Sequence, residues 1–376
     1  MINPVFFYEE LKKNGIDFFT GVPDSLLKNI CACITDKSEG KEHIISANEG
    51  NAAALAAGYH LATGKIPLVY MQNSGLGNII NPLMSLTCSE VYGIPMILLI
   101  GWRGEPGTKD EPQHVKQGAV TLELLKTMGI PYDIVPDNEQ EAATQLKEVC
   151  RKSAETSSPS ALVVRKDTFD SYVLQKKTEP LSTMTREDAI ELIVHSYPED
   201  TVFLSTTGHI SRELYEIRKK DRQVCRDFLN VGSMGHVSQI ALGVALNKPE
   251  KTVVCLDGDG AALMHTGGLR IIAEKAPANL HHVILNNGVH GSVGGQPTAA
   301  RGFSLAETAR VMGYKQIFTA VDESSLRQYL EDFSRAEGPV LMEVLVSTFA
   351  RKDLGRPQET PQENKRNFMK KLETPS

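Results

Sequence analysis

The sequence lacks the features that mark several large classes of protein. Its 376 residues contain no long apolar run, no low-complexity tract and no short-period repeat. The 40 basic and 46 acidic residues give a formal net charge of −6, which argues against a whole-chain binder of nucleic acid or of an anionic membrane. A membrane helix needs about 18 consecutive apolar residues, and no run approaches that length. We therefore expect a cytoplasmic protein with no nucleic-acid or membrane partner.

Cysteines are few and scattered. None of the six forms a C-x-x-C pair, and several lie inside apolar runs, which favours buried, reduced thiols over a zinc site or a secreted disulfide framework. The first residues place two glutamates directly after a short apolar patch, so no signal peptide is predicted. With 41% apolar and 23% charged residues, the composition is that of an ordinary globular protein with a sizeable core.

Short apolar runs alternate with helical patterns in both halves of the chain. Strands that alternate with helices indicate βαβ units, so the pattern predicts an α/β fold of two open, mainly parallel-sheet domains. The alternation fades in the middle, where Lys176, Lys177 and Pro180 suggest a linker. The predicted division is residues 1–170 for the first domain, 171–184 for the linker, 185–350 for the second domain, and 351–376 for a charged C-terminal tail that we expect to be solvated.

The most specific signal lies in the second half, where polar residues follow two apolar runs. Gly258-Asp259-Gly260 comes after one predicted strand, and Asn286-Asn287 comes after the next. In open α/β sheets, ligands bind at the carboxyl ends of the strands. If the two strands are close in the sheet, the Asp259 carboxylate and the Asn287 amide oxygen can bind one hard cation such as Mg²⁺. A simple turn would explain Gly-Asp-Gly alone, but the correctly placed pair of motifs is harder to obtain by accident.

This pair of motifs resembles the metal–diphosphate signature of the thiamine-diphosphate-dependent enzymes. The resemblance implies that Mg²⁺ is bound by Asp259, by the Asn287 side chain and by the Val289 carbonyl. It also implies that the Gly232 carbonyl holds the aminopyrimidine and that Met234 wedges the cofactor into its bent form, although core packing is the ordinary role of a methionine. The implied cofactor-binding residues of this half are Thr207, Gly208, His209, Gly232, Met234, Gly258, Gly260 and Ala261.

The first half carries the complementary residues. Glu49 lies between a predicted strand and an Ala-rich helix, where a carboxylate is favoured by the helix N-terminus. In the enzymes that the chain resembles, a glutamate here bonds N1′ of the aminopyrimidine held by a partner subunit, which implies a homodimer or higher homo-oligomer with shared active sites. Ser74 is implied to lie beside the cofactor, with a Gly-rich turn as the alternative. Asp24 is implied to relay a proton, with a helix cap as the alternative.

A loop of unusual composition, residues 101–114, follows another predicted strand. Its Arg103, Lys109 and His114 suit a multiply charged anion, although a solvated loop of mixed charge is the alternative. Together with residues 18–28 and 287–296, this loop resembles the branch of the family that acts on phosphonate-bearing keto acids. The candidate substrate contacts are Arg103, Lys109, Ser25, Ser292 and Arg301, and the proton donor is His114, His290 or a water.

The resemblance implies decarboxylation of a small anionic keto acid, 3-phosphonopyruvate, to phosphonoacetaldehyde and CO₂ in phosphonate biosynthesis. The cofactors would be thiamine diphosphate and Mg²⁺. Sulfopyruvate, which differs only in its anionic head, is an alternative substrate. Another 2-keto acid decarboxylase or carboligase of the family is a further alternative, and a non-catalytic cofactor-binding protein is the alternative from another class. The length leaves no room for the middle domain of the larger relatives.

Overall fold

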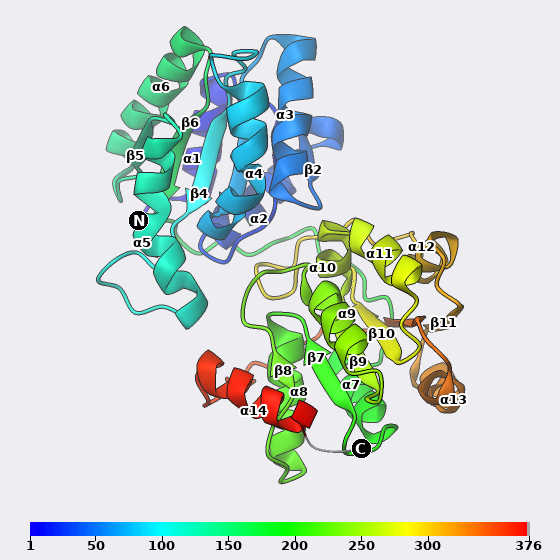
Figure 1. The fold of residues 1–376 in the computed structure, drawn as a ribbon. Coiled ribbons are helices and arrows are strands. Elements are labelled where there is room, and N and C mark those ends of the chain that lie inside the picture. The colour runs from blue at the N-terminus through cyan, green and yellow to red at the C-terminus, as the bar shows by residue number, and fades with distance from the viewer. Residues whose placement is uncertain (374–376) are drawn as a thin grey trace. The chain divides into compact units, whose positions relative to one another are not determined.

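The chain, described for residues 1–373 by a computed structural model, folds into two compact α/β units (Figure 1). The first unit comprises residues 1–177 with 290–297, and the second comprises 178–289 with the residues from 298 onward. Each unit contains one six-stranded sheet in which all paired strands are parallel. The predicted fold class is therefore confirmed.

The sheet of the first unit has the strand order β2-β1-β3-β4-β6-β5. Its strands are β1 (Phe19–Gly21), β2 (His43–Ile45), β3 (Leu68–Gln72), β4 (Ile97–Gly101), β5 (Tyr132–Ile134) and β6 (Ser160–Val164). Its helices are α1 (Pro4–Lys13), α2 (Lys28–Lys37), α3 (Glu49–Thr63), α4 (Leu76–Pro82), α5 (Pro112–Thr127) and α6 (Glu139–Thr156). Helices α1, α2 and α6 pack on one face of the sheet, and α3, α4 and α5 pack on the other.

The sheet of the second unit has the order β11-β12-β10-β9-β7-β8. Its strands are β7 (Val202–Ser205), β8 (Phe228–Leu229), β9 (Val253–Gly258), β10 (Leu280–Asn286), β11 (Gln316–Ala320) and β12 (Val340–Leu345). Its helices are α7 (Arg186–His195), α8 (His209–Lys220), α9 (Val237–Asn247), α10 (Asp259–Met264), α11 (Gly267–Lys275), α12 (Leu305–Met312), α13 (Glu323–Arg335) and α14 (Pro361–Glu373).

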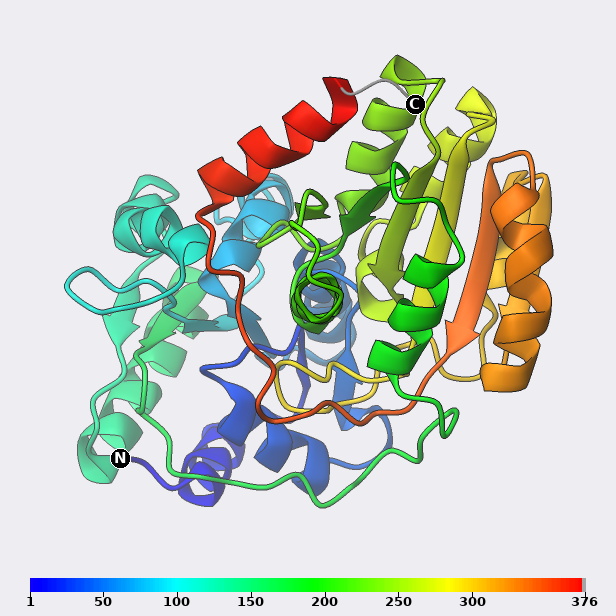
Figure 2. The same ribbon diagram turned by 90° about the horizontal axis from the view of Figure 1, so that it is seen from below.

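Helices cover both faces of this second sheet as well. Helices α7, α8 and α13 share one apolar cluster with it, and α9, α11 and α12 share the other; Figure 2 shows α13 alongside β12. Because both faces of each sheet are buried, the central strands are continuous apolar runs rather than alternating ones. This is the physical reason why short apolar runs marked the strands in the sequence.

The C-terminal segment differs from the expected solvated tail. Residues 361–373 form α14, which packs against β8, the edge strand of the second sheet (Figure 1). The ring of Phe368 lies edge-on to Phe228 at 5.4 Å between centroids. The Asn364 side chain accepts a hydrogen bond from Leu229 N at 3.2 Å and donates one to the Asp227 carbonyl at 2.9 Å. The expectation was wrong here because two buried side chains dock an otherwise charged helix.

Two further expectations from the sequence concern the cysteines and membrane-spanning helices. All six cysteines are free, and five of them are buried, as the scattered spacing indicated. Across residues 1–373, none of the helices combines the length and the apolar character that crossing a membrane requires.

Candidate active site

The two predicted metal ligands lie at the same edge of the second sheet. Strands β9 and β10 are neighbours, and their pairing runs up to Gly258 opposite Leu285. Asp259 and Asn287 therefore follow the carboxyl ends of adjacent strands. The Asp259 side chain accepts a hydrogen bond from the Thr298 hydroxyl, and Asn287 Oδ1 accepts one from the Val289 N–H at 3.1 Å.

Asp259 has the electrostatics of a cation ligand. Burial raises the pKa of its carboxyl group to about 6, against the opposing effects of the Thr298 hydroxyl and of the Gly260 and Asn287 backbone N–H groups. A carboxylate with only 4% of its surface exposed is costly to keep ionised, and a divalent cation would offset that cost. The donors present are all oxygens, which is the set that Mg²⁺ prefers. These residues therefore fit the implied metal.

The carboxyl end of β7, the strand next to β9, has features that suit an anionic group. Thr207 donates its hydroxyl to the Val231 carbonyl at 2.9 Å, and Gly208 has φ of 95°, a conformation that favours glycine, immediately before α8. Thr206 Oγ1 and Asn230 Nδ2 are buried polar atoms that have no hydrogen-bond partner within residues 1–373. Buried polar groups are rarely left unpaired, so two such groups beside the predicted diphosphate segment are consistent with a polar ligand there.

His209 begins α8, beside this edge. Burial, Arg186 and Arg212 lower the pKa of its imidazole to about 4, so the ring is neutral near pH 7. A neutral His209 can contribute a hydrogen bond to a diphosphate, but it adds no positive charge. This distinction was not visible in the sequence.

The predicted aminopyrimidine segment is a tight turn that leads into α9. Gly232 N donates weakly to Asn230 Oδ1 at 3.4 Å, and Met234 is partly buried. Gly235 has φ of 86°, and a Cβ there would lie 2.7 Å from His265 Cδ2. The turn therefore requires glycine at 235. This constrains the backbone of residues 232–234, which lie between β8 and α9.

In the first unit, Glu49 contacts two residues that the sequence did not identify as its neighbours, Asn78 and Gly75. Asn48 caps α3 by accepting from Asn51 N, and Glu49 is the first helical residue, with 5% of its surface exposed. Asn78 donates its side-chain amide to Glu49 Oε2 at 2.7 Å. A Cβ at Gly75 would lie 2.5 Å from Glu49 Oε1. Only glycine at 75 leaves room for the carboxyl group in this orientation.

A second carboxylate is linked to Ser74 through Gln72. Gln72 donates to Asp24 Oδ1 at 2.7 Å and accepts from the Ser74 hydroxyl at 2.8 Å. Asp24 Oδ2 accepts from Leu26 N at 2.9 Å. Burial raises the pKa of Asp24, although its hydrogen bonds oppose that shift. The structure thus joins Asp24 and Ser74 in one network, and the proton relay assigned to Asp24 stays a prediction.

Within the 101–114 loop, Arg103 is paired inside the protein. Its guanidinium forms a bidentate ion pair with Asp110 and donates to the Ser25 hydroxyl at 2.7 Å. The start of the loop is held by Asn73, which donates to the Arg103 carbonyl at 2.8 Å and to Thr121 Oγ1 at 2.9 Å. Arg103 and Ser25, both predicted substrate contacts, are therefore in contact with each other.

The other predicted substrate and proton-donor residues occupy varied surroundings. Lys109 and Ser292 are exposed, whereas Arg301 donates to the Glu179 carbonyl at 2.7 Å. Burial lowers the pKa of His114 to about 4, with Arg103 adding to the effect, and burial alone lowers the pKa of His290 to about 4. Both imidazoles are neutral near pH 7. Their roles toward a substrate stay predictions.

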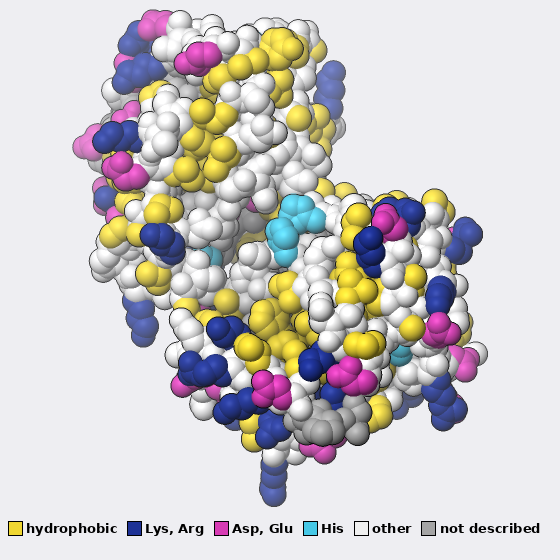
Figure 3. Space-filling model, in the orientation of Figure 1, with side chains coloured by type: hydrophobic (Ala, Val, Ile, Leu, Met, Phe, Trp, Pro, Cys, Tyr) yellow, Lys and Arg dark blue, Asp and Glu magenta, His cyan; other side chains and the backbone are white. Residues whose placement is uncertain are grey.

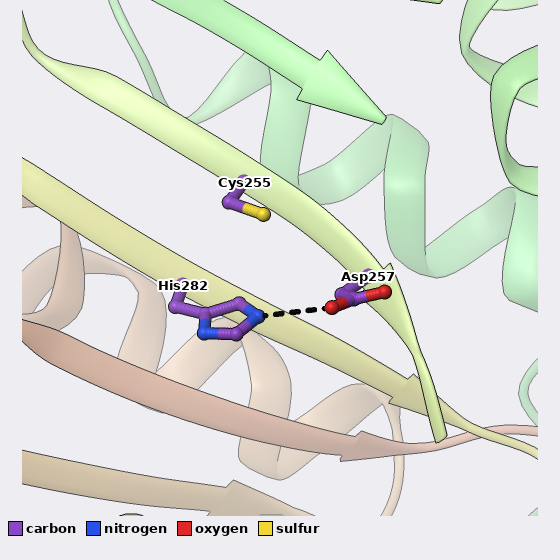
Figure 4. A group of neighbouring side chains, drawn as sticks. All are labelled: Cys255, Asp257 and His282. Carbon is purple, nitrogen blue, oxygen red and sulfur yellow. Dashed lines mark ion pairs between the residues drawn. The ribbon is translucent and has the colours of Figure 1, made fainter. Parts of the chain in front are cut away.

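Another cluster of potential ligands lies deeper in the second sheet. Cys255, Asp257 and His282 place one thiol, one carboxylate oxygen and one imidazole nitrogen within 4.8 Å of one another (Figure 4). All three residues are buried. Mixed sulfur, nitrogen and oxygen donors do not suit Mg²⁺, so this cluster is distinct from the predicted Mg²⁺ site at Asp259 and Asn287. No motif in the sequence marks this cluster.

Comparison with known proteins gives matches over both units. Residues 6–124 match the thiamine pyrophosphate enzyme N-terminal TPP binding domain, and residues 206–344 match the C-terminal TPP binding domain. The chain is 35% identical to phosphonopyruvate decarboxylase of Streptomyces viridochromogenes, over 96% of this chain and 92% of that protein. It is 35% identical to phosphonopyruvate decarboxylase of Streptomyces hygroscopicus, over 94% and 90%. It is 34% identical to sulfopyruvate decarboxylase of Methanosarcina acetivorans, over 78% and 77%.

Proposed function

This chain belongs to the thiamine pyrophosphate enzymes and, within them, to the phosphonopyruvate decarboxylase family, and from that premise we propose that it converts 3-phosphonopyruvate to phosphonoacetaldehyde and CO₂. It is a carbon–carbon lyase that uses thiamine diphosphate, with Mg²⁺ as the proposed metal, in phosphonate biosynthesis. The observation that carries the proposal is similarity over 96% of the chain, which includes both the Glu49 and the Asp259 segments. The six free thiols support a location in the reducing cytoplasm.

Thiamine diphosphate, when bound, supplies the nucleophilic carbon and the electron sink that loss of CO₂ requires. In our proposal Asp259, Asn287 and the Val289 carbonyl hold Mg²⁺, and Glu49 holds a proton at N1′ of the aminopyrimidine. Asn78, which donates to Glu49 Oε2, keeps that carboxyl group in one orientation. The buried position of Glu49 keeps competing water away from it.

Besides the proton that Glu49 holds at N1′, a proton must be added to the substrate. The carbon that carried the carboxylate must gain one proton after CO₂ leaves. His114 and His290 are the candidate donors, together with Asp24 or a water. Because both imidazoles are neutral near pH 7, each suits a relay that gives up one N–H while its other nitrogen accepts a proton. The buried, raised-pKa carboxyl group of Asp24 suits the same kind of relay.

A panel of 3-substituted pyruvates tests the proposed substrate. With purified protein, Mg²⁺ and thiamine diphosphate, kcat/KM for 3-phosphonopyruvate is expected to exceed that for pyruvate by about 100-fold or more, because pyruvate lacks the anionic head that the proposed basic contacts bind. The measurement is the rate of aldehyde formation. A higher kcat/KM for sulfopyruvate would replace the phosphonate assignment with the second candidate, which the 34% identical relative favours. No aldehyde from any keto acid would contradict decarboxylation.

We further propose that two copies of the chain associate through the face of the first unit that carries α3. The outer side of α3 exposes two small residues, Ala54 and Gly58, beside two leucines, Leu55 and Leu61. Tyr92, after α4, is 71% exposed. Figure 3 shows hydrophobic side chains gathered on the face of this unit that carries α3 and α4. Small side chains allow a neighbouring helix to approach closely, which supports a homodimer as the working form.

The L55R variant tests this association. A charge placed on an apolar face that is buried in a dimer is costly, so L55R is expected to shift the protein toward monomer in sedimentation equilibrium. V311R is the matched control, since Val311 is a 79% exposed apolar residue on α12 of the other unit. V311R is expected to keep the wild-type mass. Equal masses for L55R and wild-type protein would exclude this face.

A further inference from the structure

A row of buried polar side chains crosses from β9 to β10 beneath the predicted metal-binding turn. Asp257 lies on β9 and His282 on β10, and Figure 4 shows their side chains facing each other. Their exposed fractions are 1% and 0%, and Tyr314, just after α12, is 4% exposed. None of these residues was assigned a role by the sequence. Burying polar groups costs free energy unless they are paired, so each contact in the row affects the stability of this part of the sheet.

The contacts in the row join four residues one after another. The Tyr314 hydroxyl is 3.1 Å from His282 Nδ1, and His282 Nε2 is 3.4 Å from Asp257 Oδ2. Asp257 Oδ1 accepts a hydrogen bond from Gly258 N at 2.9 Å. A tyrosine hydroxyl and an imidazole nitrogen can each donate or accept, so the tautomer of His282 sets the direction of that hydrogen bond. The row therefore runs from Tyr314 through His282 and Asp257 to Gly258.

The middle contact is the weakest part of the row. At 3.4 Å it is not a hydrogen bond, and neither Asp257 Oδ2 nor His282 Nε2 has another hydrogen-bond partner among the described residues. The thiol of the neighbouring Cys255 makes no hydrogen bond to either atom, and burial raises the pKa of that thiol well above the usual range. The two atoms lie 3.4 Å apart, so their contact places the end of β9 against the middle of β10.

The end of the row reaches the turn that carries the predicted metal ligand. Gly258, held by Asp257, is the last residue of β9, and Asp259 follows it as the first residue of α10. Asn287, the other side-chain ligand, follows β10, the strand that carries His282. The Asp257–His282 contact therefore joins the two strands that lead to the ligands, in addition to the backbone pairing of β9 with β10. Groups that orient metal ligands from behind typically change metal affinity by about 10- to 100-fold when they are removed.

We propose that Asp257, His282 and Tyr314 are positioning residues that hold the Gly258–Asp259 turn in the orientation required for Mg²⁺ and the diphosphate. This inference rests on the proposed function, because it concerns affinity for the proposed cofactor. It assigns no step of the reaction to these three residues. Their effect is on the geometry of Asp259, and so on the concentration of Mg²⁺ that the protein needs.

The same strand offers a matched control. His281, the residue before His282, is also buried, and its Nδ1 lies 2.7 Å from the Tyr197 hydroxyl while its Nε2 lies 3.0 Å from the Ala336 carbonyl. It therefore belongs to an equivalent histidine–tyrosine pair that ends at a loop carbonyl and not at the metal-binding turn. Substitutions in this pair should cost stability without changing the turn.

The experiment measures Mg²⁺-dependent binding of thiamine diphosphate by calorimetry, together with thermal unfolding of the cofactor-free protein. H282Q is expected to raise the Kd by about 10-fold and Y314F by less, because Y314F removes only the far end of the row. H281Q and Y197F are expected to lower the unfolding temperature while leaving the Kd unchanged. In turnover assays, H282Q should need more Mg²⁺ for half-maximal rate, with the KM for the keto acid unchanged.

Several outcomes would overturn the proposal. It is wrong if Y314F and H282Q leave the Kd within twofold of wild type, or if the His281 pair changes the Kd to the same extent. Y314F keeps the test valid where H282Q does not fold. A stoichiometric transition metal bound at Cys255, Asp257 and His282, found by elemental analysis, would also overturn it. Wild-type protein that binds no thiamine diphosphate would instead contradict the proposed function, so the two failures are distinguishable.

Discussion

The E49Q variant is expected to lose about 100- to 10,000-fold in turnover, the range typical of a missing general acid–base group. Glutamine has nearly the same shape as glutamate, so it can occupy the space beside Gly75 and keep a hydrogen bond to Asn78. What it cannot do is share a proton with a ring nitrogen as a carboxyl group does. The affinity for thiamine diphosphate is therefore expected to change little, and calorimetry would show this beside the loss of turnover.

The E139Q variant is the matched control for this prediction. Glu139 is also the first residue of its helix, α6, and follows the N-cap Asn138, as Glu49 follows Asn48 in α3. Both substitutions remove a negative charge from a helix N-terminus, which costs about 0.3–1 kcal/mol. Only E49Q should affect turnover. Turnover of E49Q within tenfold of wild type would refute the activation that we assign to Glu49.

The second large effect is expected at Asp259. D259A should weaken Mg²⁺-dependent binding of thiamine diphosphate by more than about 100-fold, since it removes a direct ligand and not merely a supporting group. Burial already raises the pKa of this carboxyl group to about 6, so removing it relieves a cost in the metal-free protein. We therefore expect metal-free D259A to unfold at a temperature similar to wild type, while the stabilisation by Mg²⁺ and cofactor disappears.

Calorimetry and thermal unfolding with and without Mg²⁺ and cofactor would test this prediction. D322A, in the same unit, is the control, because Asp322 caps α13 by accepting from Ser325 N. Losing that cap costs about 1 kcal/mol, with no change expected in cofactor affinity. Cofactor binding by D259A that equals wild type would remove Asp259 from the metal site.

Local patterns predicted the parallel α/β character of both units and the polar residues at their strand ends. Hydrophobic runs identify strands because both faces of these sheets are buried. Gly258-Asp259-Gly260 comes directly after such a run, so its place at a strand end can be predicted from the sequence. The same patterns failed at the C-terminus. Charge predicted a solvated end for residues 351–376, whereas Asn364 and Phe368 dock α14 against the edge strand β8. Two buried residues among many charged ones leave little signal in composition.

The sequence by itself determined which chemical groups are present, namely the carboxylate before an Ala-rich helix and the oxygen ligands after two apolar strands. It did so because each of those signals is local in the chain. Only the tertiary structure decided the neighbours of those groups. Asn78 donates a hydrogen bond to Glu49, which is 29 residues away in the sequence, and His282 faces Asp257 because β10 pairs with β9. Spacing along a chain does not reveal which strands pair, and pairing determines which polar groups can hold a ligand in place.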